Sequence, residues 1–336
     1  MASNFRIFRD YASACADAGP ALARDNQRWI FDRGEWFELA ARHTLEGEPL
    51  VIKGEAGGSN CWLFLEQLGS TANALSNWYS LRFNVITSGP NPPVGALVDG
   101  LKSVGAGHIM LDPTGPMDEL SAQLKRAGWL VRREEINVSW QIDTSAMSFE
   151  QYWDARPSRL KNTYKRKVKK AGLDCVIHHH LDEGVWADVT QVFDNSWKKP
   201  DGTPEMTHDL FAQEAQAGTL RVGLAYKDGA PVAAQLWTIE NGLAIIHLLS
   251  YREDSKDLSA GTILSHEMFR HALDEAKASR IDFGYGDHAY KREWMDERVP
   301  LYAITAYHLL SWSGLKGFAA MIWRKVISRL PGSKDA

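Results

Sequence analysis

The residues best suited to chemistry form a basic run that could bind phosphates. Between Arg156 and Lys170 no Asp or Glu interrupts the cations, which are Arg156, Arg159, Lys161, Lys165, Arg166, Lys167, Lys169 and Lys170. Their spacing follows helical rows, in which like charges three and four residues apart destabilise a helix. The run therefore predicts a surface for the phosphates of a nucleotide-bearing cofactor, for RNA or for anionic lipid headgroups, with a solvated helix face as the purely structural alternative.

A second anion site is predicted where a long helix, expected over Ser259–Ser279, begins. Its first residues are Ser259, Ala260, Gly261 and Thr262. Ser259 could cap the helix, and the small residues leave the N–H groups of the first turn open. Open N–H groups at the positive end of the helix dipole suit a pyrophosphate, although many helices begin with Ser and Gly for structural reasons alone.

Other patterns do not support the chemistry that they first suggest. Gly284–Ala289 fits G-x-G-x-x-A, but a dinucleotide fold needs an acidic residue about 20 positions later, where Ile304, Thr305 and Ala306 stand. We interpret this turn as backbone that must approach something closely. The five residues from His266 to His271 rotate the second histidine about 140° from the first, which is wrong for a zinc helix. We expect no metal.

Composition limits the class of protein. A chain of 336 residues, 44% hydrophobic and 24% charged, is globular and long enough for roughly two domains. The net charge of −4 argues against a general nucleic-acid-coating protein,. Three distant cysteines without a C-x-x-C pair favour a reducing compartment,. With no predicted signal peptide or transmembrane segment, we expect a cytoplasmic protein, at most peripheral on the inner membrane.

Helices and strands alternate, and two stretches follow one plan. In each, a helix leads to a short strand that ends near Asp and Gly, and a long aromatic strand follows. The short strands are expected at His108–Leu111 and Arg280–Phe283, and the long ones at Trp129–Ile142 and Leu301–Trp312. This pattern predicts a duplicated α/β unit with a boundary near Ser145–Ser148.

The second stretch resembles the tandem type of GNAT acyltransferase. The string Asp282–Asp287 (D-F-G-Y-G-D), the residues Tyr290–Trp294 and the helix Arg159–Arg166 are similar to the branch of cellulose-biosynthesis-like proteins and Fem peptidoglycan aminoacyltransferases. The resemblance covers about residues 150–310, and the earlier half only as a degenerate first copy. The family's pyrophosphate loop contains several glycines, of which only Gly261 is present here. Because of this departure, the resemblance leaves two kinds of donor open, acyl-CoA and another acyl carrier.

The resemblance implies a fold of two tandem GNAT-like α/β units, each a mixed central sheet flanked by helices. The expected segments are a degenerate N-terminal half over 1–145, an acyl-donor-binding catalytic half over 146–312, and a C-terminal amphipathic helix and tail over 313–336.

It also implies N-acylation, in which a primary amine attacks a thioester, a base accepts the proton and donors hold the oxyanion. His247 and Tyr251 would lie where the sheet opens toward the thioester, and Asp287 near the same edge. Lys291 matches the Fem-type lysine that stabilises developing negative charge.

The resemblance also implies a binding site for the donor. The donor's phosphates would bind Ser259, Ala260, Gly261 and Thr262 together with Arg159, Lys165 and Arg166. Acyl-CoA is then a substrate, and no tightly bound cofactor is expected. His247 could instead be a core histidine, and Asp287 could merely bridge the turn.

The C-terminal residues bear on the acceptor. Over Gly314–Leu330 one expected helix face carries Leu315, Phe318, Ala319, Ile322, Val326 and Leu330, with Lys316, Arg324, Lys325 and Arg329 beside it. Such a helix lies on an anionic membrane or packs against the second domain. A surface-attached enzyme suits a lipid amine such as a sphingoid base, and some relatives of this branch resemble bacterial ceramide synthases. The alternatives are an exopolysaccharide sugar amine, an amino acid, Fem-like use of aminoacyl-tRNA, and a non-catalytic binding module.

Overall fold

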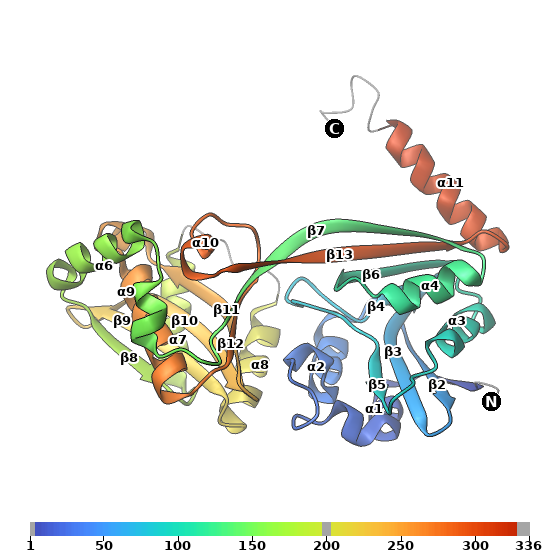
Figure 1. Ribbon diagram of the computed structural model, residues 1–336, viewed down its shortest axis with the longest axis horizontal. Helices are drawn as coiled ribbons and strands as arrows, with labels where there is room; N and C mark the ends of the chain where they lie inside the picture. Colours follow the sequence, from blue (N-terminus) through green and yellow to red (C-terminus); the bar gives the residue numbers. More distant parts are fainter. Residues whose placement is uncertain (1–3, 197–202, 328–336) are drawn as a thin grey trace. The chain divides into compact units, whose positions relative to one another are not determined.

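The computed structural model describes residues 4–196 and 203–327, with side chains described as far as Trp323. The chain forms two compact units, unit 1 with residues 1–136 and 300–336 and unit 2 with residues 137–299. Two long strands, β7 (Trp129–Asp143) and β13 (Glu297–His308), each begin in one unit and end in the other (Figure 1). The units therefore divide within these strands and not at residues 145 and 312. The assignment of one half as catalytic and the other as degenerate stays a prediction.

Unit 1 is a mixed sheet in the order β1-β2-β3-β4-β6-β13. Its strands are β1 (Asn4–Phe8), β2 (Glu48–Ala56), β3 (Ser59–Leu68), β4 (Thr71–Ala74), β6 (His108–Thr114) and β13, and β5 (Ile86–Ser88) pairs with β3. All neighbours are antiparallel except β4 and β6. The helices are α1 (Tyr11–Ala18), α2 (Gly34–Thr44), α3 (Val94–Ser103), α4 (Asp118–Arg126) and α11 (Trp312–Ile327).

Unit 2 repeats this plan in the order β7-β12-β11-β10-β9-β8. Its strands are β8 (Asp174–His178), β9 (Leu220–Lys227), β10 (Ala230–Glu240), β11 (Leu243–Tyr251), β12 (Arg280–Tyr285) and β7. Here β11 and β12 are the parallel pair. The helices are α5 (Phe149–Asp154), α6 (Ser158–Ala171), α7 (Glu183–Asp194), α8 (Pro204–Gln216), α9 (Ala260–Arg270) and α10 (Lys291–Trp294). The expected tandem of GNAT-like α/β units is thus confirmed.

The last strand of each sheet comes from the other half of the chain. β7 follows the helices of unit 1 in sequence but pairs with β12 of unit 2, whereas β13 follows the helices of unit 2 and pairs with β6 of unit 1. Exchange of these strands explains why the boundaries expected from chain order differ from those of the compact units.

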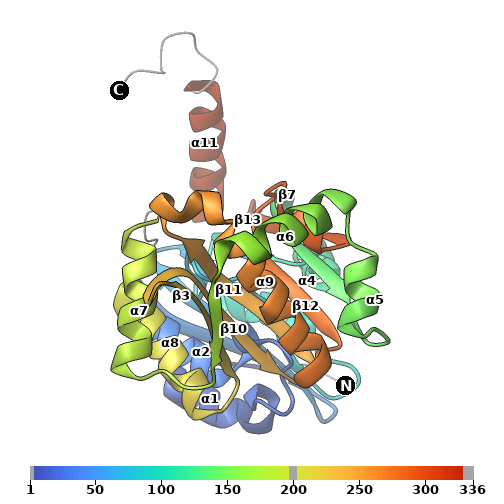
Figure 2. The same cartoon turned by 90° about the vertical axis from the view of Figure 1, so that its left-hand side faces the viewer.

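Helices cover both faces of the unit 2 sheet, with α6 and α9 on one face and α7 and α8 on the other (Figure 2). The core on the α9 face is aromatic, because the Phe269 ring contacts Trp237 at 5.2 Å, Trp294 at 4.8 Å and Tyr152 at 5.1 Å between centroids. The helix predicted over Ser259–Ser279 is shorter than expected: α9 ends at Arg270, and a π-helical turn covers His271–Glu275.

Candidate active site

The two parallel strands of unit 2 separate partway along their length. β11 and β12 pair only over Leu243–Ile245 and Arg280–Asp282, although β11 continues to Tyr251 and β12 to Tyr285. Beyond this point β12 pairs with β7 alone. Ligands of open α/β sheets bind at the carboxyl ends of such strands, where neighbouring connections diverge. We therefore take this separation as the candidate active site.

His247 lies at a β-bulge on the edge of the separation. Trp237 of β10 is opposite Ile246 and Leu236 is opposite Leu248, so His247 is the extra residue of β11. Bulges redirect side chains and are frequent beside active sites. The Nε2 atom of His247 lies 2.8 Å from Thr238 Oγ1.

The His247 imidazole is held in its neutral form. Burial lowers its pKa to about 4, although Glu214 nearby acts in the opposite direction, and its ring contacts the edge of Phe211 on α8. A neutral imidazole can accept a proton from a reacting amine near pH 7.

Tyr251, at the end of β11, lies on the other face of the sheet. A Cβ atom on Gly261 would lie 3.5 Å from its ring, which places the ring against the start of α9. His247 contacts Phe211 of α8, whereas Tyr251 lies against the start of α9, and these two helices cover opposite faces of the sheet (Figure 2). The structure therefore does not bring these two predicted catalytic residues together on one face.

Lys291, the first residue of α10, is buried beneath the turn that follows β12, with 4% of its surface exposed. Its ammonium donates to the carbonyl oxygens of Phe283 at 2.8 Å, Gly284 at 3.1 Å and Tyr285 at 2.7 Å. An ammonium group has three donors, and each has a carbonyl partner here. The ammonium group therefore holds the turn in place. Contact between Lys291 and the negative charge that develops during the reaction stays a prediction.

Asp282 holds the same turn from the other side. Its buried carboxylate accepts hydrogen bonds from Gly284 N at 2.7 Å, Ser139 Oγ at 2.5 Å and Gln141 Nε2 at 2.8 Å. Sequence reasoning placed Asp282 in a motif without assigning it a role. An Asp within an otherwise apolar strand was the available signal, because a buried carboxylate requires partners.

Asp287 is a solvent-accessible carboxylate at the end of this turn. It accepts hydrogen bonds from Arg292 at 2.9 Å and from Trp140 Nε1 at 3.1 Å. The Arg292 guanidinium, followed by the Trp140 indole, holds the pKa of Asp287 below its usual range. Asp287 is therefore ionised at neutral pH and engaged in an ion pair.

The predicted pyrophosphate site at the start of α9 differs in one detail from expectation. Ser259 adopts a left-handed conformation, with φ of 56°, and its side chain does not cap the helix; its backbone N–H donates to Lys256 O at 3.2 Å. The expected serine cap is therefore wrong. The helix begins at buried Ala260, with half-buried Gly261 and Thr262 after it, and the first N–H groups of any helix lack intrahelical acceptors.

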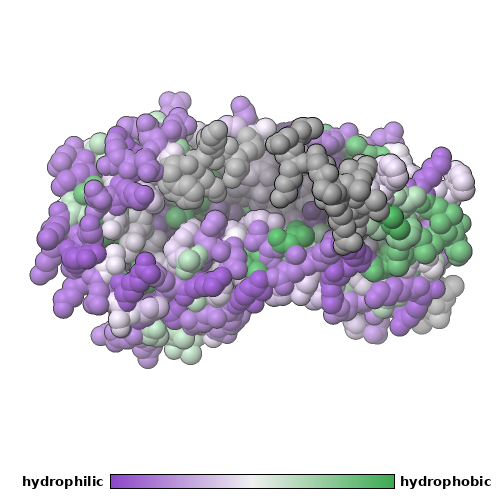
Figure 3. Space-filling view, turned by 90° about the horizontal axis from the view of Figure 1, so that it is seen from above, coloured by the Kyte–Doolittle hydropathy of each residue, from purple (hydrophilic) through white to green (hydrophobic). Residues whose placement is uncertain are grey.

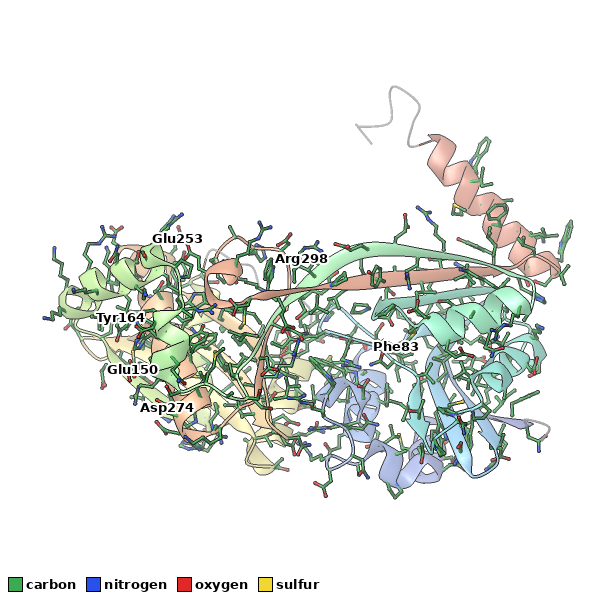
Figure 4. All side chains as sticks on the ribbon, viewed as in Figure 1. Phe83, Glu150, Tyr164, Glu253, Asp274 and Arg298 are labelled. Atoms are coloured by element: carbon green, nitrogen blue, oxygen red, sulfur yellow. The ribbon has the colours of Figure 1, made fainter. Side chains whose placement is uncertain are left out.

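The basic helix α6 packs beside α9. Tyr164, labelled in Figure 4, stacks on His266 of α9 with 3.8 Å between ring centroids. Lys167 Nζ donates to Asp257 O at 2.5 Å just before α9. Gly172, with φ of 55°, ends the helix, as a left-handed residue commonly does.

The cations of α6 divide into two groups. Arg156, just before the helix, is buried and pairs with Asp296 at 2.9 Å. Lys161 donates to Asp154 O and Lys167 to Asp257 O, so these three have structural contacts. The exposed group lies on the outer face and consists of Arg159, Lys165, Arg166, Lys169 and Lys170. Arg159 lies 3.6 Å from Glu293. The structure thus leaves the three predicted phosphate-binding cations accessible.

Neither a metal site nor a membrane span is found within residues 4–196 and 203–327. No group of three His, Cys, Asp or Glu side chains there could hold a metal ion. No helix in that part of the chain is long and apolar enough to cross a membrane.

Part of the chain matches a known family. Residues 158–292 match the family described as acetyltransferase (GNAT) domain, and this segment contains α6, α9, β11, β12 and the turn held by Lys291. No curated protein matches the chain.

Solved structures share the architecture of the whole chain. The C-terminal domain of a putative lysylphosphatidylglycerol synthetase from Agrobacterium fabrum is 15% identical, with a TM-score of 0.59, 93% of this chain covered and 97% of that one. FemX is 11% identical, with a TM-score of 0.59, and the match covers 90% of this chain and 97% of the FemX chain. A tandem GNAT protein from the clavulanic acid biosynthesis pathway is 12% identical, with a TM-score of 0.50, and the match covers 91% of this chain and 99% of that one. These similarities establish the fold.

Proposed function

We propose that the protein is an N-acyltransferase that moves an acyl group from acyl-CoA to a primary amine, with a lipid amine such as a sphingoid base as acceptor. The observation that carries the proposal is the separation of β11 and β12 within the segment that matches an acetyltransferase domain. Such a gap between parallel strands can hold an extended thioester arm.

The start of α9 supports CoA as the donor. The helix begins where the chain returns from the end of β11, so its open N–H groups lie at the wide end of the separation and suit a pyrophosphate. The exposed cations of α6, which packs on α9, add positive charge for the remaining phosphate,.

His247 is the proposed base. The amine nitrogen attacks the thioester carbonyl carbon, the C–N bond forms and the C–S bond breaks. The amine's proton passes to the neutral imidazole, which then gives it to the departing CoA sulfur, so that CoA leaves as the thiol and His247 returns to its neutral form. The bulge suits this role because it turns His247 out of the regular ladder. The lowered pKa keeps the imidazole unprotonated at neutral pH and at the same time makes it a weaker base than a histidine with a pKa near 7,.

Apolar surroundings favour a lipid amine over a sugar. His247 contacts Phe211 and is followed by half-buried Leu248 on the separated part of β11. An apolar lining binds a hydrocarbon chain and offers few partners to sugar hydroxyls.

Aminoacyl transfer is the second candidate. Two of the similar structures are FemX and a domain of a putative lysylphosphatidylglycerol synthetase, and the outer face of α6 presents cations along its length, as RNA binding requires,. A non-catalytic binding module is the third, because the start of α9 has one glycine where the family's pyrophosphate loop has more.

Mass spectrometry of reaction products tests the proposal. The purified protein is incubated with acyl-CoA of several chain lengths, or with aminoacyl-tRNA, and with a panel of sphingoid, sugar and amino-acid amines. We expect an amide of a long-chain amine that forms with acyl-CoA and is lost in His247→Gln. Product from aminoacyl-tRNA alone would support the second candidate, and CoA binding without any product would support the third.

A further inference from the structure

Through its described side chains, helix α11 packs on the rest of unit 1 along the side that carries Gly314 and Gly317. Ser311 Oγ accepts a hydrogen bond from Gly314 N at 3.1 Å and caps the helix. A Cβ atom on Gly314 would lie 2.8 Å from Gly107 O, and one on Gly317 would lie 3.4 Å from the Tyr307 ring. Phe318 adds an edge contact to Tyr307. The side of α11 with the glycines therefore packs against β13 and the residue before β6.

The opposite side is apolar and exposed. Trp312 is 74% exposed, Leu315 43%, Ile322 46% and Trp323 67%, and Ala319 between them is also exposed. At 100° per residue these five positions span an arc of about 100°. Figure 3 shows hydrophobic side chains gathered where this helix lies.

The exposed face differs from the expected one in three described residues, because it gains Trp312 and Trp323 and loses Phe318. Phe318, assigned to it from sequence, is turned toward Tyr307, while Val326 and Leu330 lie outside the described side chains. Soluble proteins rarely expose such a contiguous apolar surface unless it binds something. The surface, which we call the α11 face, consists of Trp312, Leu315, Ala319, Ile322 and Trp323.

Charge indicates what binds there. Between Arg298 and Lys334 the sequence contains no Asp or Glu, and Lys316, Arg324, Lys325 and Arg329 lie within or just after the helix, in a chain whose net charge is −4. Lys316 Nζ lies 5.6 Å from the Trp312 ring. Tryptophan rings favour the headgroup level of a bilayer, and cations beside them bind anionic headgroups. A second copy would bring two equally positive helices together, so a membrane fits better.

We propose that the α11 face binds the surface of an anionic bilayer, with the helix in the interfacial plane and its tryptophans at the headgroup boundary. This binding does not require the proposed enzymatic activity. It also deepens that proposal, because it would bring the enzyme to the surface that contains a lipid amine; this consequence rests on the proposed function.

Two adjacent alanines provide a matched test. Ala319 lies in the middle of the α11 face, whereas Ala320, also exposed, lies 100° away and off the glycine side,. Ala319→Glu and Ala320→Glu add the same charge at exposed positions of one helix. Co-sedimentation is measured with phosphatidylglycerol–phosphatidylcholine vesicles at low salt, and circular dichroism checks that both variants fold.

We expect the wild type to bind these vesicles at low salt and to lose most binding in about 1 M salt, which shortens the Debye length to about 3 Å. Ala320→Glu should weaken binding about fivefold, through its charge. Ala319→Glu should weaken it by on the order of a further tenfold, because its carboxylate would enter the boundary region.

Equal losses in the two variants, or no binding by the wild type, would overturn the proposal. A dimer in solution that Ala319→Glu dissociates, without vesicle binding, would assign the α11 face to a second copy instead. Acylation of a short soluble amine separates the two proposals: active protein that ignores vesicles contradicts only the membrane site, and vesicle-bound protein without transfer contradicts only the proposed function.

Discussion

The Nζ atom of Lys291 lies 2.8 Å from the carbonyl oxygen of Phe283. With two further carbonyl partners, Gly284 and Tyr285, the buried ammonium fastens the turn at the end of β12 to the start of α10. The same turn leads to Asp287, one of the predicted catalytic residues. Lys291 thus connects the stability of unit 2 with the position of its candidate catalytic residues.

Substitution of Lys291 should reduce stability as well as turnover. Lys291→Met preserves the length of the chain but leaves three carbonyls without their donor, which should cost about 3 kcal/mol of unfolding free energy. Denaturant unfolding measures this. A turnover loss of about 10²–10³ with unchanged stability would instead assign the lysine directly to the oxyanion.

Asp282→Asn should destabilise the protein more than Asp287→Asn. The first substitution disturbs a buried carboxylate with three donors and should cost about 1–3 kcal/mol. The second disturbs a solvent-accessible ion pair, whose contribution to stability is small. The two melting temperatures are compared directly, and equal values would contradict the assigned role of Asp282.

His247 should make stability fall as the solution becomes acidic. Its pKa is about 4 in the folded protein and about 6.5 when unfolded, so between these values only the unfolded chain binds the proton. The stability that the neutral imidazole provides is present above about pH 6.5 and is lost as pH falls toward 4. The loss attributable to this residue should be on the order of 3 kcal/mol.

His247→Gln isolates this contribution, because other histidines titrate in the same range. The difference in unfolding free energy between wild type and variant should shrink from pH 7 to pH 4. If His247 is also the base, turnover should fall about 10²–10⁴-fold in the variant. In the wild type, kcat, which reports on the enzyme–substrate complex, should then decline only when the pH is lowered to near 4. An activity limb at pH 6.5 would argue against this residue.

Thr262→Asp should weaken CoA binding without unfolding α9. An acidic residue in the first turn of a helix is favourable for the helix but repels a pyrophosphate placed there. Thr262→Asn is the control of equal size without the charge. Isothermal titration with CoA should show a higher Kd for the Asp variant than for the Asn variant. Equal Kd values would remove the start of α9 from the donor site.

The sequence by itself determined the repeated α/β plan and several of its elements. Local periodicity and turn residues place the short strand before Gly284, the basic helix that ends at Gly172 and the helix that begins beside Gly261, because these features depend on neighbours in the chain. The D-F-G-Y-G-D string then indicated the acetyltransferase-like half.

Only the tertiary structure decided which groups meet. The exchange of β7 and β13 depends on partners more than a hundred residues away, which no local pattern encodes. The bulge at His247 shifts the register of β11, so strand alternation could not predict its face or its Thr238 contact. Lys291 reaches three carbonyls only once α10 folds beneath the turn. Finally, close approach at Gly107 and Gly314 turned one side of α11 inward and left its tryptophans exposed.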